Sequence, residues 1–451
     1  MHFTRRRRDR IASPLFVALT LLISGGATAS CSSDDGDGDG PASDVLDAAA
    51  DVPSTPSDAG IAPPDVRDAG SIDAAPLPIA CATPPCATAL VTTLGANVDD
   101  RSEGFCALLD DGAIACWGAN GAGQLGRGAE AGKSDSSDAE RVLGLADVAS
   151  IDHTCAVTKA GDVWCWGTGP FLQQASGAAV TTERAPVKLD LPPATSVSVG
   201  YASACAAVDG GLHCWGSNTN AQLAPHPTPS DDKGFPRAVA LPTGAPIRAM
   251  VVGTATFALR DDGTLVTWGA NPPLGRVSSV FPDPSPGPVA LDGFSSVDLA
   301  HDNACATAAG IGYCWGAPAV PGKGSTLDRA LPEPVVTPEP IVDIATTQTH
   351  VIPGLGLKRS RWCAVSTFGD VFCWGLNESG QAGDGTQDYA FHAVRVADLP
   401  GPAARVKTTP NATCALLTSG KVFCWGSNYN GQLGNGQTPR RSFVPVEVKL
   451  P

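Results

Sequence analysis

The stretch Cys106-Ala-Leu-Leu-Asp-Asp-Gly-Ala-Ile-Ala-Cys116-Trp-Gly decides the fold, because the same pattern returns along the chain. Two short apolar runs flank a turn that ends in Gly112, and no apolar residues recur at helical spacing, so the stretch predicts a β-hairpin. Its Trp-Gly dipeptide returns about every 50 residues, an interval typical of propeller blades. The tryptophans are Trp117, Trp166, Trp215, Trp268, Trp315, Trp374 and Trp425. We therefore expect an all-β protein, a seven-bladed β-propeller of four-stranded blades.

Six of the seven units place two cysteines on the two strands of this hairpin. The cysteines are ten residues apart where the loop has three residues ending in Gly, and nine apart where it has two, so they stand opposite each other in every case. Opposed residues of antiparallel strands have Cα atoms about 4.5–5.5 Å apart, which a disulfide can span. The predicted bridges are Cys106–Cys116, Cys155–Cys165, Cys205–Cys214, Cys305–Cys314, Cys363–Cys373 and Cys414–Cys424.

The unit around Trp268 lacks both cysteines and has Phe257 and Thr267 in their places, as expected if the two act as a pair. The remaining cysteines are Cys31 and the pair Cys81 and Cys86, which we predict to form a seventh bridge. The alternative to disulfides is that the cysteines bind zinc, but structural zinc sites need cysteines two to four residues apart. Disulfides indicate an oxidising compartment.

The N-terminus has the features of an export signal. Arg5–Arg8 is followed by the apolar run Ile11–Ile23, which is shorter than the roughly 20 residues that span a bilayer, and then by small residues. We predict a signal peptide at residues 1–30. Cys31 after this pattern resembles the lipidated first residue of bacterial lipoproteins, and plain secretion is the alternative.

Residues 31–80 are predicted to form a disordered acidic tether that begins at the lipidated Cys31. Ser32–Ala80 contains eleven Asp and one Arg among many Ala and Pro, and such a segment cannot bury enough apolar surface to offset its ordering entropy. A lipid and a tether would hold a folded domain, residues 81–451, off a membrane. We expect a bacterial cell-envelope location, as an outer-membrane lipoprotein facing the periplasm or the surface.

The repeated unit, hairpin and Trp-Gly tail together, resembles the repeat of the regulator of chromosome condensation family, although the tail is eroded after Trp166, Trp268 and Trp315. The fullest copies are Trp117–Gly126 and Trp425–Gly434, which share Trp-Gly-x-Asn-x-x-Gly-Gln-Leu-Gly. The resemblance covers about residues 85–451 and implies a seven-bladed propeller. The family includes an exchange factor for the small GTPase Ran, and other members bind diverse proteins. The cysteine pairs depart from the family pattern and resemble an adaptation to export.

We expect the ring to close through the two ends of the chain. The last strand-like run, Val444–Leu450, has no following blade, and the first blade, which starts at Ala89–Thr93, has no preceding strand of that type. Pairing the two runs would remove exposed strand edges. The C-terminal strand is therefore predicted to join the N-terminal blade.

Composition and motifs argue against several classes of function. The net charge of −15 disfavours nucleic acid as a partner, since phosphate binding needs a basic surface. The chain has no nucleophile elbow, P-loop or dinucleotide fingerprint, and its histidines lack metal-ligand spacing. We therefore predict no enzyme, no cofactor and no metal site, and we expect His153 to be a hydrogen-bonding residue within a blade.

A protein partner is the expected ligand, bound by loops that differ between blades. Three basic residues beside a tryptophan on an acidic chain suit an acidic partner, and two tyrosines in loops are further anchors. The candidate contact residues are Lys358, Arg359, Arg361, Trp362, Tyr389 and Tyr429. For the basic group, a solvated insertion is the alternative.

The function expected from these features is that of an envelope-anchored lipoprotein whose disulfide-stabilised propeller is a protein-binding or scaffold module. Two alternatives stay open. One is a propeller-based envelope lyase or hydrolase. The other is a secreted inhibitor that resembles the β-lactamase inhibitor of this propeller type.

Overall fold

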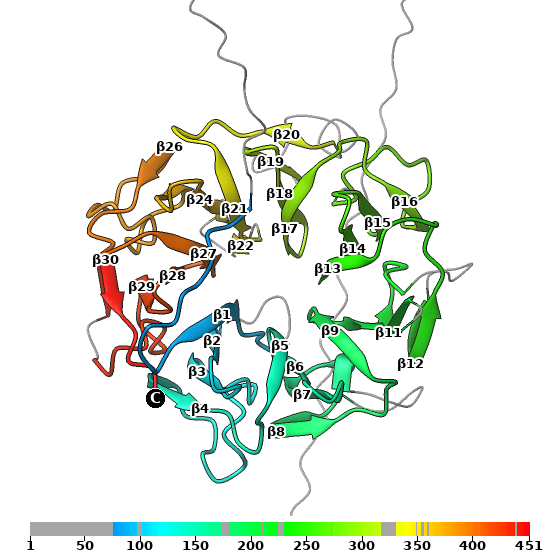
Figure 1. Ribbon diagram of the computed structural model, residues 1–451, viewed down its shortest axis with the longest axis horizontal. Helices are drawn as coiled ribbons and strands as arrows, with labels where there is room; N and C mark the ends of the chain where they lie inside the picture. Colours follow the sequence, from blue (N-terminus) through cyan, green and yellow to red (C-terminus); the bar gives the residue numbers. More distant parts are fainter. Residues whose placement is uncertain are drawn as a thin grey trace, which may run out of the picture. The chain divides into compact units, whose positions relative to one another are not determined.

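The computed structural model describes residues 75–96, 102–172, 180–209, 211–223, 230–271, 273–316, 331–348, 350–352, 356–358, 360–437 and 440–451. The chain divides into a unit of residues 1–66 and a unit of residues 67–451, and every described residue lies in the second. This second unit is a ring of seven four-stranded sheets, as Figure 1 shows. The prediction of an all-β, seven-bladed propeller is confirmed.

We number the blades 1 to 7 in chain order. Their strands are β1–β4 (Ala87–Thr92, Gly104–Leu109, Ile114–Gly118, Ser136–Arg141), β5–β8 (Val148–Asp152, Cys155–Thr158, Val163–Thr168, Thr182–Lys188), β9–β12 (Ala194–Val199, Ser203–Val208, Gly211–Asn218, Ser230–Val239), β13–β16 (Ile247–Val252, Ala255–Arg260, Leu265–Gly269, Asp283–Pro288), β17–β20 (Phe294–Ala300, Asn303–Ala308, Ile311–Gly316, Glu333–Pro334), β21 with β24–β26 (Ile341–Thr346, Arg361–Ser366, Val371–Gly375, Ala390–Arg395) and β27–β30 (Ala403–Thr408, Ala412–Leu417, Val422–Ser427, Arg441–Glu447). Blade 6 also carries the hairpin β22–β23 (His350–Ile352 and Gly356–Lys358) between its first two strands. A short 3₁₀ helix, Pro170–Leu172, follows β7.

The first strand of every blade lies nearest the axis of the ring, and the fourth lies at the rim (Figure 1). The first strands contact one another around the whole ring, from β1 through β27 and back to β1. The predicted closure by a shared strand is therefore wrong. The C-terminal strand β30 pairs with β29, and β1 pairs with β2. Strand β30 lies at the rim of blade 7 and β1 lies near the axis in blade 1 (Figure 1), so the two strands are too far apart to pair.

The seam between blades 7 and 1 is closed by packing and by backbone hydrogen bonds. Ala87 N donates to Gly420 O at 2.8 Å, and Ala80 N donates to Thr418 O at 2.7 Å. Side chains of both blades share one buried apolar cluster, and Ile79 packs against it. The chain therefore contacts the ring from Ile79 onward, slightly before the expected start at residue 81.

All seven predicted disulfides are present. The six hairpin bridges join cysteines that are direct partners in the strand register, with Cα atoms 4.0–4.1 Å apart. Cys81 and Cys86 form the seventh bridge. In blade 4, Phe257 and Thr267 occupy the same opposed register, and Phe257 packs against Trp315 of blade 5 with ring centroids 6.1 Å apart.

The hairpin turns explain the change in cysteine spacing. In the three-residue loops the closing glycine has a positive φ, as at Gly112 (80°) and Gly420 (79°). The two-residue loop of blade 5 has positive φ at both Ala309 (47°) and Gly310 (80°), as a type I′ turn requires. One residue fewer in the loop thus brings the second cysteine back opposite the first.

Most of the apolar core lies between neighbouring blades, where six of the seven repeat tryptophans are buried and Trp374 is half-buried. No helix in the described part of the chain is long and apolar enough to cross a membrane. The predicted signal peptide, Cys31 and most of the predicted tether lie outside the described residues.

Candidate functional site

In six of the seven blades, the repeat tryptophan donates a hydrogen bond from its indole to the blade before it. The indole Nε1 of Trp166 donates to Gln124 O at 2.8 Å. The same bond crosses the seam, where Trp117 Nε1 donates to Gln432 O at 2.9 Å. Gly434 lies against the Trp117 ring, and a Cβ there would come within 2.8 Å of it. The motif's last glycine therefore makes room for the tryptophan of the next blade.

The asparagine and glutamine side chains of the repeat accept hydrogen bonds from backbone N–H groups of their own loop. Asn120 Oδ1 accepts from Leu125 N at 3.1 Å, and Gln124 Oε1 accepts from Ala122 N at 2.9 Å. The same two bonds recur in three other blades. The repeat residues hold the ring together, so the features left for recognition are the segments that differ from blade to blade.

One end of the ring carries the connections in which the blades differ most. Since the strands of a blade are consecutive and antiparallel, the bend between its first two strands and the loop after its tryptophan lie at the same end. Backbone hydrogen bonds join them, as from Ala119 N to Glu103 O at 2.9 Å and from Ser427 N to Asn411 O at 2.8 Å. We call this end the loop face. The opposite end, the hairpin face, carries the short turns between the paired cysteines.

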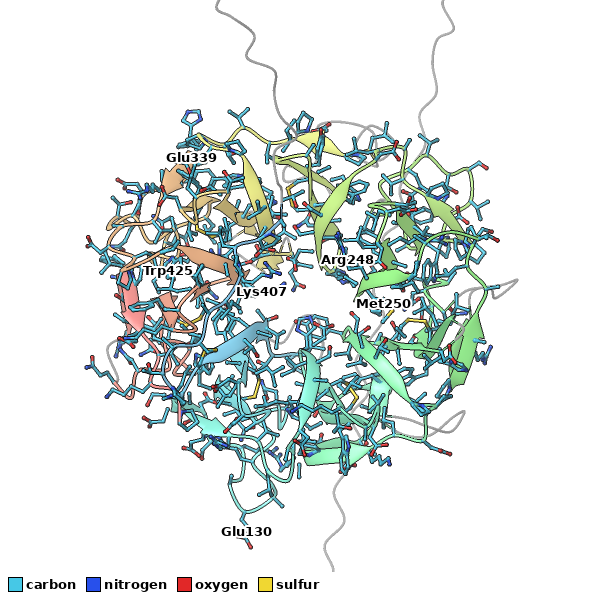
Figure 2. All side chains as sticks on the ribbon, in the orientation of Figure 1. Glu130, Arg248, Met250, Glu339, Lys407 and Trp425 are labelled. Carbon is cyan, nitrogen blue, oxygen red and sulfur yellow. A yellow bond between two sulfur atoms is a disulfide. The ribbon has the colours of Figure 1, made fainter. Side chains whose placement is uncertain are left out.

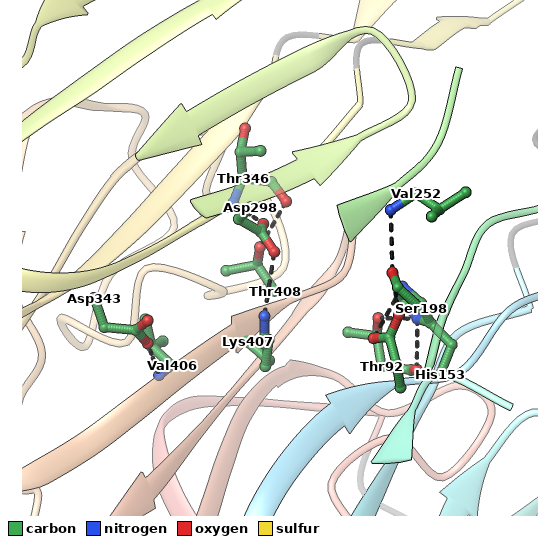
Figure 3. Close-up of polar contacts among 11 residues, drawn as sticks. Thr92, His153, Ser198, Val252, Asp298, Asp343, Thr346, Val406, Lys407 and Thr408 are labelled. Carbon is green, nitrogen blue, oxygen red and sulfur yellow. Dashed lines mark hydrogen bonds and ion pairs between the residues drawn. The ribbon is translucent and has the colours of Figure 1, made fainter. Parts of the chain in front are cut away.

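The first strands end at the loop face in a chain of hydrogen bonds between blades, drawn in Figure 3. Asp152 Oδ2 of blade 2 accepts from Ser198 Oγ at 2.8 Å and from Val199 N at 3.0 Å in blade 3. Ser198 Oγ accepts in turn from Val252 N of blade 4 at 3.1 Å. A first strand has no further strand on its axial side, so these side chains satisfy backbone N–H groups at that edge.

The same arrangement links blades 5, 6 and 7. Asp298 Oδ2 accepts from Thr346 N at 2.9 Å, and its Oδ1 accepts from Lys407 Nζ at 3.2 Å. Asp343 Oδ2 accepts from Val406 N at 3.0 Å. Figure 2 shows Lys407 at the centre of the ring. Asp298 and Lys407 each stand opposite the first cysteine of their blade in the strand register. The position of that cysteine could therefore have pointed to these two residues in the sequence.

Charges near the axis shift the pKa of two of these groups. Burial alone would lower the pKa of Lys407, but the carboxylates of Asp298, Asp343 and Asp152 outweigh it and raise that pKa. Burial raises the pKa of Asp343, although Arg405 and Lys407 act in the opposite direction. The axial residues therefore form a polar and ionic joint between blades.

His153 is a hydrogen-bonding residue of the ring, as expected. Its Nδ1 lies 2.8 Å from Thr92 O and 3.0 Å from Thr92 Oγ1, which links blade 2 to blade 1. Within the described ranges, no three acidic, histidine or cysteine side chains gather closely enough to hold a metal ion.

Two buried charged residues hold the Thr409–Ala412 bend of blade 7 from both sides. Glu103 of blade 1 is 4% exposed, and its carboxylate accepts from Thr409 Oγ1 at 2.5 Å and from Asn411 Nδ2 at 2.5 Å. Arg361 of blade 6 is 1% exposed and donates to Thr409 O through Nε at 3.0 Å and Nη2 at 2.7 Å. It also donates to Ala412 O.

Both charges are perturbed by their surroundings. Burial raises the pKa of Glu103, against the lowering effect of the hydrogen bonds from Thr409 and Asn411. Burial lowers the pKa of Arg361 to about 9, and the charge of Glu103 opposes that shift.

The expectation that Arg361 contacts a partner is wrong, because its guanidinium is buried and engaged between blades 6 and 7. The signal for this role is its position two residues before the first cysteine, which His153 and Asn303 share. Asn303 Nδ2 likewise donates to Thr347 O of the next blade at 2.9 Å. In these three blades the side chain at this position joins neighbouring blades.

The other candidate contact residues are separated in space. Trp362 is half-buried and stacks on Trp374 of its own blade, with ring centroids 6.1 Å apart. Lys358 ends β23, and Arg359 lies outside the described residues, so a contact role for these two stays a prediction.

The two tyrosines lie in loops on the loop face. Tyr389 packs against Phe391 beside the rim of blade 6, with ring centroids 4.8 Å apart. Tyr429 is 72% exposed in the turn that follows Trp425. The neighbouring Asn430 Nδ2 donates to Asp135 Oδ2 of blade 1 at 2.7 Å, so this turn spans the seam.

Comparison with known proteins agrees with the ring geometry. The family model of the regulator of chromosome condensation (RCC1) repeat matches residues 419–451, and a second model of this repeat matches residues 148–173. The chain is therefore similar to proteins of the RCC1 repeat family. The two matched segments fall in blades 7 and 2, which lie on either side of blade 1.

The relatives and structural neighbours of this chain are distant in sequence. The ultraviolet-B receptor UVR8 of Arabidopsis thaliana is 27% identical over 75% of this chain and 78% of its own length. The Homo sapiens E3 ubiquitin-protein ligase HERC2 is 26% identical over 74% of this chain, which spans only 7% of HERC2. Among solved structures, human WBSCR16 has a TM-score of 0.60 at 18% identity, covering 75% of this chain and 95% of that one. Prp20p of Saccharomyces cerevisiae has a TM-score of 0.59 at 16% identity, covering 75% and 86%.

Proposed function

We propose that this protein is a protein-binding scaffold of the bacterial cell envelope, attached by a lipid on Cys31 and carried on the acidic tether that ends near residue 80. Its loop face contacts the partner. The observation that supports the proposal is that the repeated residues and the variable loops have different roles. Tryptophan, asparagine and glutamine of the motif bond inside the ring, and the variable loops around them are left for recognition.

The disulfides support the location outside the cytosol. Six buried bridges, one in every blade but blade 4, form only where thiols are oxidised. The export signal and Cys31 in the sequence are consistent with that compartment. Replacement of Cys31 by Ser should release the protein from the membrane fraction, and a protein that stays membrane-bound would argue against the lipid anchor.

The comparisons support a protein as the partner. The structure of Prp20p is described together with its binding to Gsp1p and histones, and a second structure shows yeast RCC1 bound to Kap60. A ring of this fold outside the cytosol would meet envelope proteins. We therefore expect it to bind a protein, as Prp20p does, but a different one.

The test is proximity labelling from the C-terminus of the full chain in the native envelope, read by mass spectrometry. Tyr429→Asp alters the loop face, and Phe368→Asp is the matched control, because Phe368 is 70% exposed on the hairpin face of blade 6. We expect one or a few envelope proteins to be enriched by the wild type and by Phe368→Asp, and severalfold less by Tyr429→Asp. Equal enrichment by all three proteins, or loss only with Phe368→Asp, would overturn the assignment of the loop face.

A further inference from the structure

The disulfide between Cys81 and Cys86 differs from the six hairpin bridges in its exposure to solvent. Eleven of the twelve hairpin cysteines are at most 1% exposed, and the twelfth, Cys314, is partly buried. Cys81, in contrast, is exposed, and so are residues 82–85 that follow it. Access to the sulfur limits how fast a thiol attacks a disulfide, so of the seven bridges this one is the most open to attack.

The two cysteines of this bridge have different surroundings. Cys86 is fully buried, and its Sγ lies so close to the turn between β28 and β29 of blade 7 that a Cβ at Gly420 would have no room. Cys81 belongs to the exposed stretch that leads into the ring. A thiol from the solvent would therefore attack the bridge at Cys81, and Cys86 would be the leaving sulfur.

The bridge lies where the chain enters the ring, at the hairpin face of the seam between blades 7 and 1. Just before the bridge, Ala80 N donates to Thr418 O of blade 7 at 2.7 Å. At its other end, Cys86 O accepts from Asp110 N of blade 1 at 2.9 Å. The bridge thus fastens the incoming segment to a residue that the ring already holds.

The two sides of the bridge are held very differently. Cys86 leads directly into β1, which is paired along its length with β2. Near Cys81, the described contacts with the ring are the hydrogen bond from Ala80 to Thr418 and the packing of Ile79 against the apolar cluster of the seam. Opening the bridge would therefore loosen the chain before Cys86 and leave β1 in place.

We infer that the Cys81–Cys86 bridge is a site of thiol–disulfide exchange. A low-molecular-weight thiol opens it and loosens residues 79–85 from the ring, while the six hairpin bridges stay closed. The reaction changes how the tether joins the ring, and it is independent of the protein that the loop face binds.

The exchange is balanced in two steps. First, the thiolate of the small molecule attacks Sγ of Cys81, the bond between the two cysteines breaks, and Sγ of Cys86 leaves with the electron pair and takes up a proton. Second, another molecule of the thiol attacks the small-molecule sulfur now attached to Cys81, and Sγ of Cys81 leaves and takes up a proton. Two small thiols are thereby oxidised to one disulfide, and both cysteines are reduced.

The first test uses the native full chain with Cys31→Ser, in which every remaining cysteine is bridged. The protein is titrated with reduced glutathione, free thiols are alkylated, and the labelled cysteines are located by peptide mapping. We expect Cys81 and Cys86 to be labelled together at a severalfold lower thiol concentration than any hairpin cysteine, the partly buried Cys314 included. A hairpin bridge that opens at the same or a lower concentration would overturn the inference.

The second test determines which sulfur reacts. In the same chain, Cys86→Ser leaves a thiol at the exposed Cys81, and Cys81→Ser leaves one at the buried Cys86. With oxidised glutathione, the Cys86→Ser variant should gain one glutathione by mass spectrometry, and the Cys81→Ser variant should gain it severalfold more slowly. Equal rates, or a faster reaction of the Cys81→Ser variant, would contradict attack at Cys81.

The third test measures the release of the chain by hydrogen exchange. The amide of Ala80, whose acceptor is Thr418 O, should exchange severalfold faster in Cys81→Ser than in the wild type. The amide of Thr418 is the matched control, because it donates to Pro402 O at 2.9 Å in the same turn of blade 7, and its exchange should not change. An unchanged rate at Ala80 would show that the bridge does not hold the segment, and faster exchange at both amides would contradict the release of this segment alone.

Discussion

Trp117 and Gln432 are 315 residues apart in the chain, yet the indole nitrogen of Trp117 lies 2.9 Å from the carbonyl oxygen of Gln432. The bond repeats the one between Trp166 and Gln124 inside the ring. The seam between the first and last blades is therefore built from the same joint that the described residues show at five other blade junctions.

Replacement of Trp117 by Phe should remove this bond and leave the Gln432 carbonyl buried without a donor. An unsatisfied buried group costs about 1–3 kcal/mol, so the free energy of unfolding in urea should fall by that amount. Trp166→Phe is the matched control inside the ring and should cost about as much. A loss at Trp166 with none at Trp117 would show that the seam is held by other contacts.

Glu103 makes a pH-dependent contribution at the seam. Because burial raises its pKa in the folded state, the folded protein binds more protons than the unfolded chain at pH values between the ordinary glutamate pKa of 4.5 and the folded pKa. The stabilisation from Glu103 is therefore complete below 4.5 and is lost as the pH rises through the folded pKa.

The measurement compares the wild type with Glu103→Gln, which cannot titrate. The unfolding free energy of the wild type minus that of the variant should fall as the pH is raised from 4 to about 8. A difference that instead grows with pH would mean that the hydrogen bonds from Thr409 and Asn411 outweigh burial.

Lys407 should contribute more to stability than an ion pair at the rim. Lys407→Met leaves the Asp298 carboxylate without the cation that it pairs with, and we expect a loss of about 1–3 kcal/mol at pH 7. Lys421→Met is the matched control. Lys421 Nζ lies 2.9 Å from Glu447, but both side chains are about half exposed, so the loss should be at most about 1 kcal/mol.

The pH dependence of this ion pair has a definite sign. Since the folded pKa of Lys407 is raised above 10.5, its contribution is fully present below 10.5 and is lost as the pH rises through the folded pKa. Denaturation curves of the wild type and Lys407→Met should therefore converge at strongly alkaline pH. Curves that separate further there would contradict the assignment.

Blade 4 tests what the disulfides contribute. Phe257→Cys with Thr267→Cys places two cysteines in the opposed register of the other blades, so titration of free thiols should show that a bridge forms. A ten-residue loop gains roughly 2.5–3 kcal/mol from closure, whereas loss of a buried Phe costs about 3–5 kcal/mol. The double variant should therefore be bridged and yet no more stable than the wild type. A clear gain in stability would show that the contact of Phe257 with Trp315 is weak.

The hairpins could be predicted from the sequence because their signals are local. Turn length, the closing glycine and the cysteine spacing act within about a dozen residues, so the register at Cys106 and Cys116 follows from sequence alone. The closure of the ring could not be predicted in the same way. Whether the last strand meets the first depends on which strand lies at the axis, and alternating apolar residues do not encode that order.

The error at Arg361 has a related cause. Its neighbours Lys358 and Arg359 in the sequence indicate a basic surface, but the strand that begins at Arg361 turns the guanidinium into the ring. Comparison with His153 and Asn303 at the equivalent position would have indicated a role between blades. Glu103 has no sequence signal of this kind, because its hydrogen bonds are made to residues more than 300 positions away.

Each hairpin disulfide lies within a single blade, and the joints between blades are non-covalent. If the chain is anchored at one end and a ligand pulls on the ring, the hairpin disulfides do not reinforce the joints between blades. The seam between blades 7 and 1 would part first, since no loop of chain crosses it. Each blade that carries a hairpin bridge would then unravel only as far as that bridge, whereas blade 4, which has none, could extend fully.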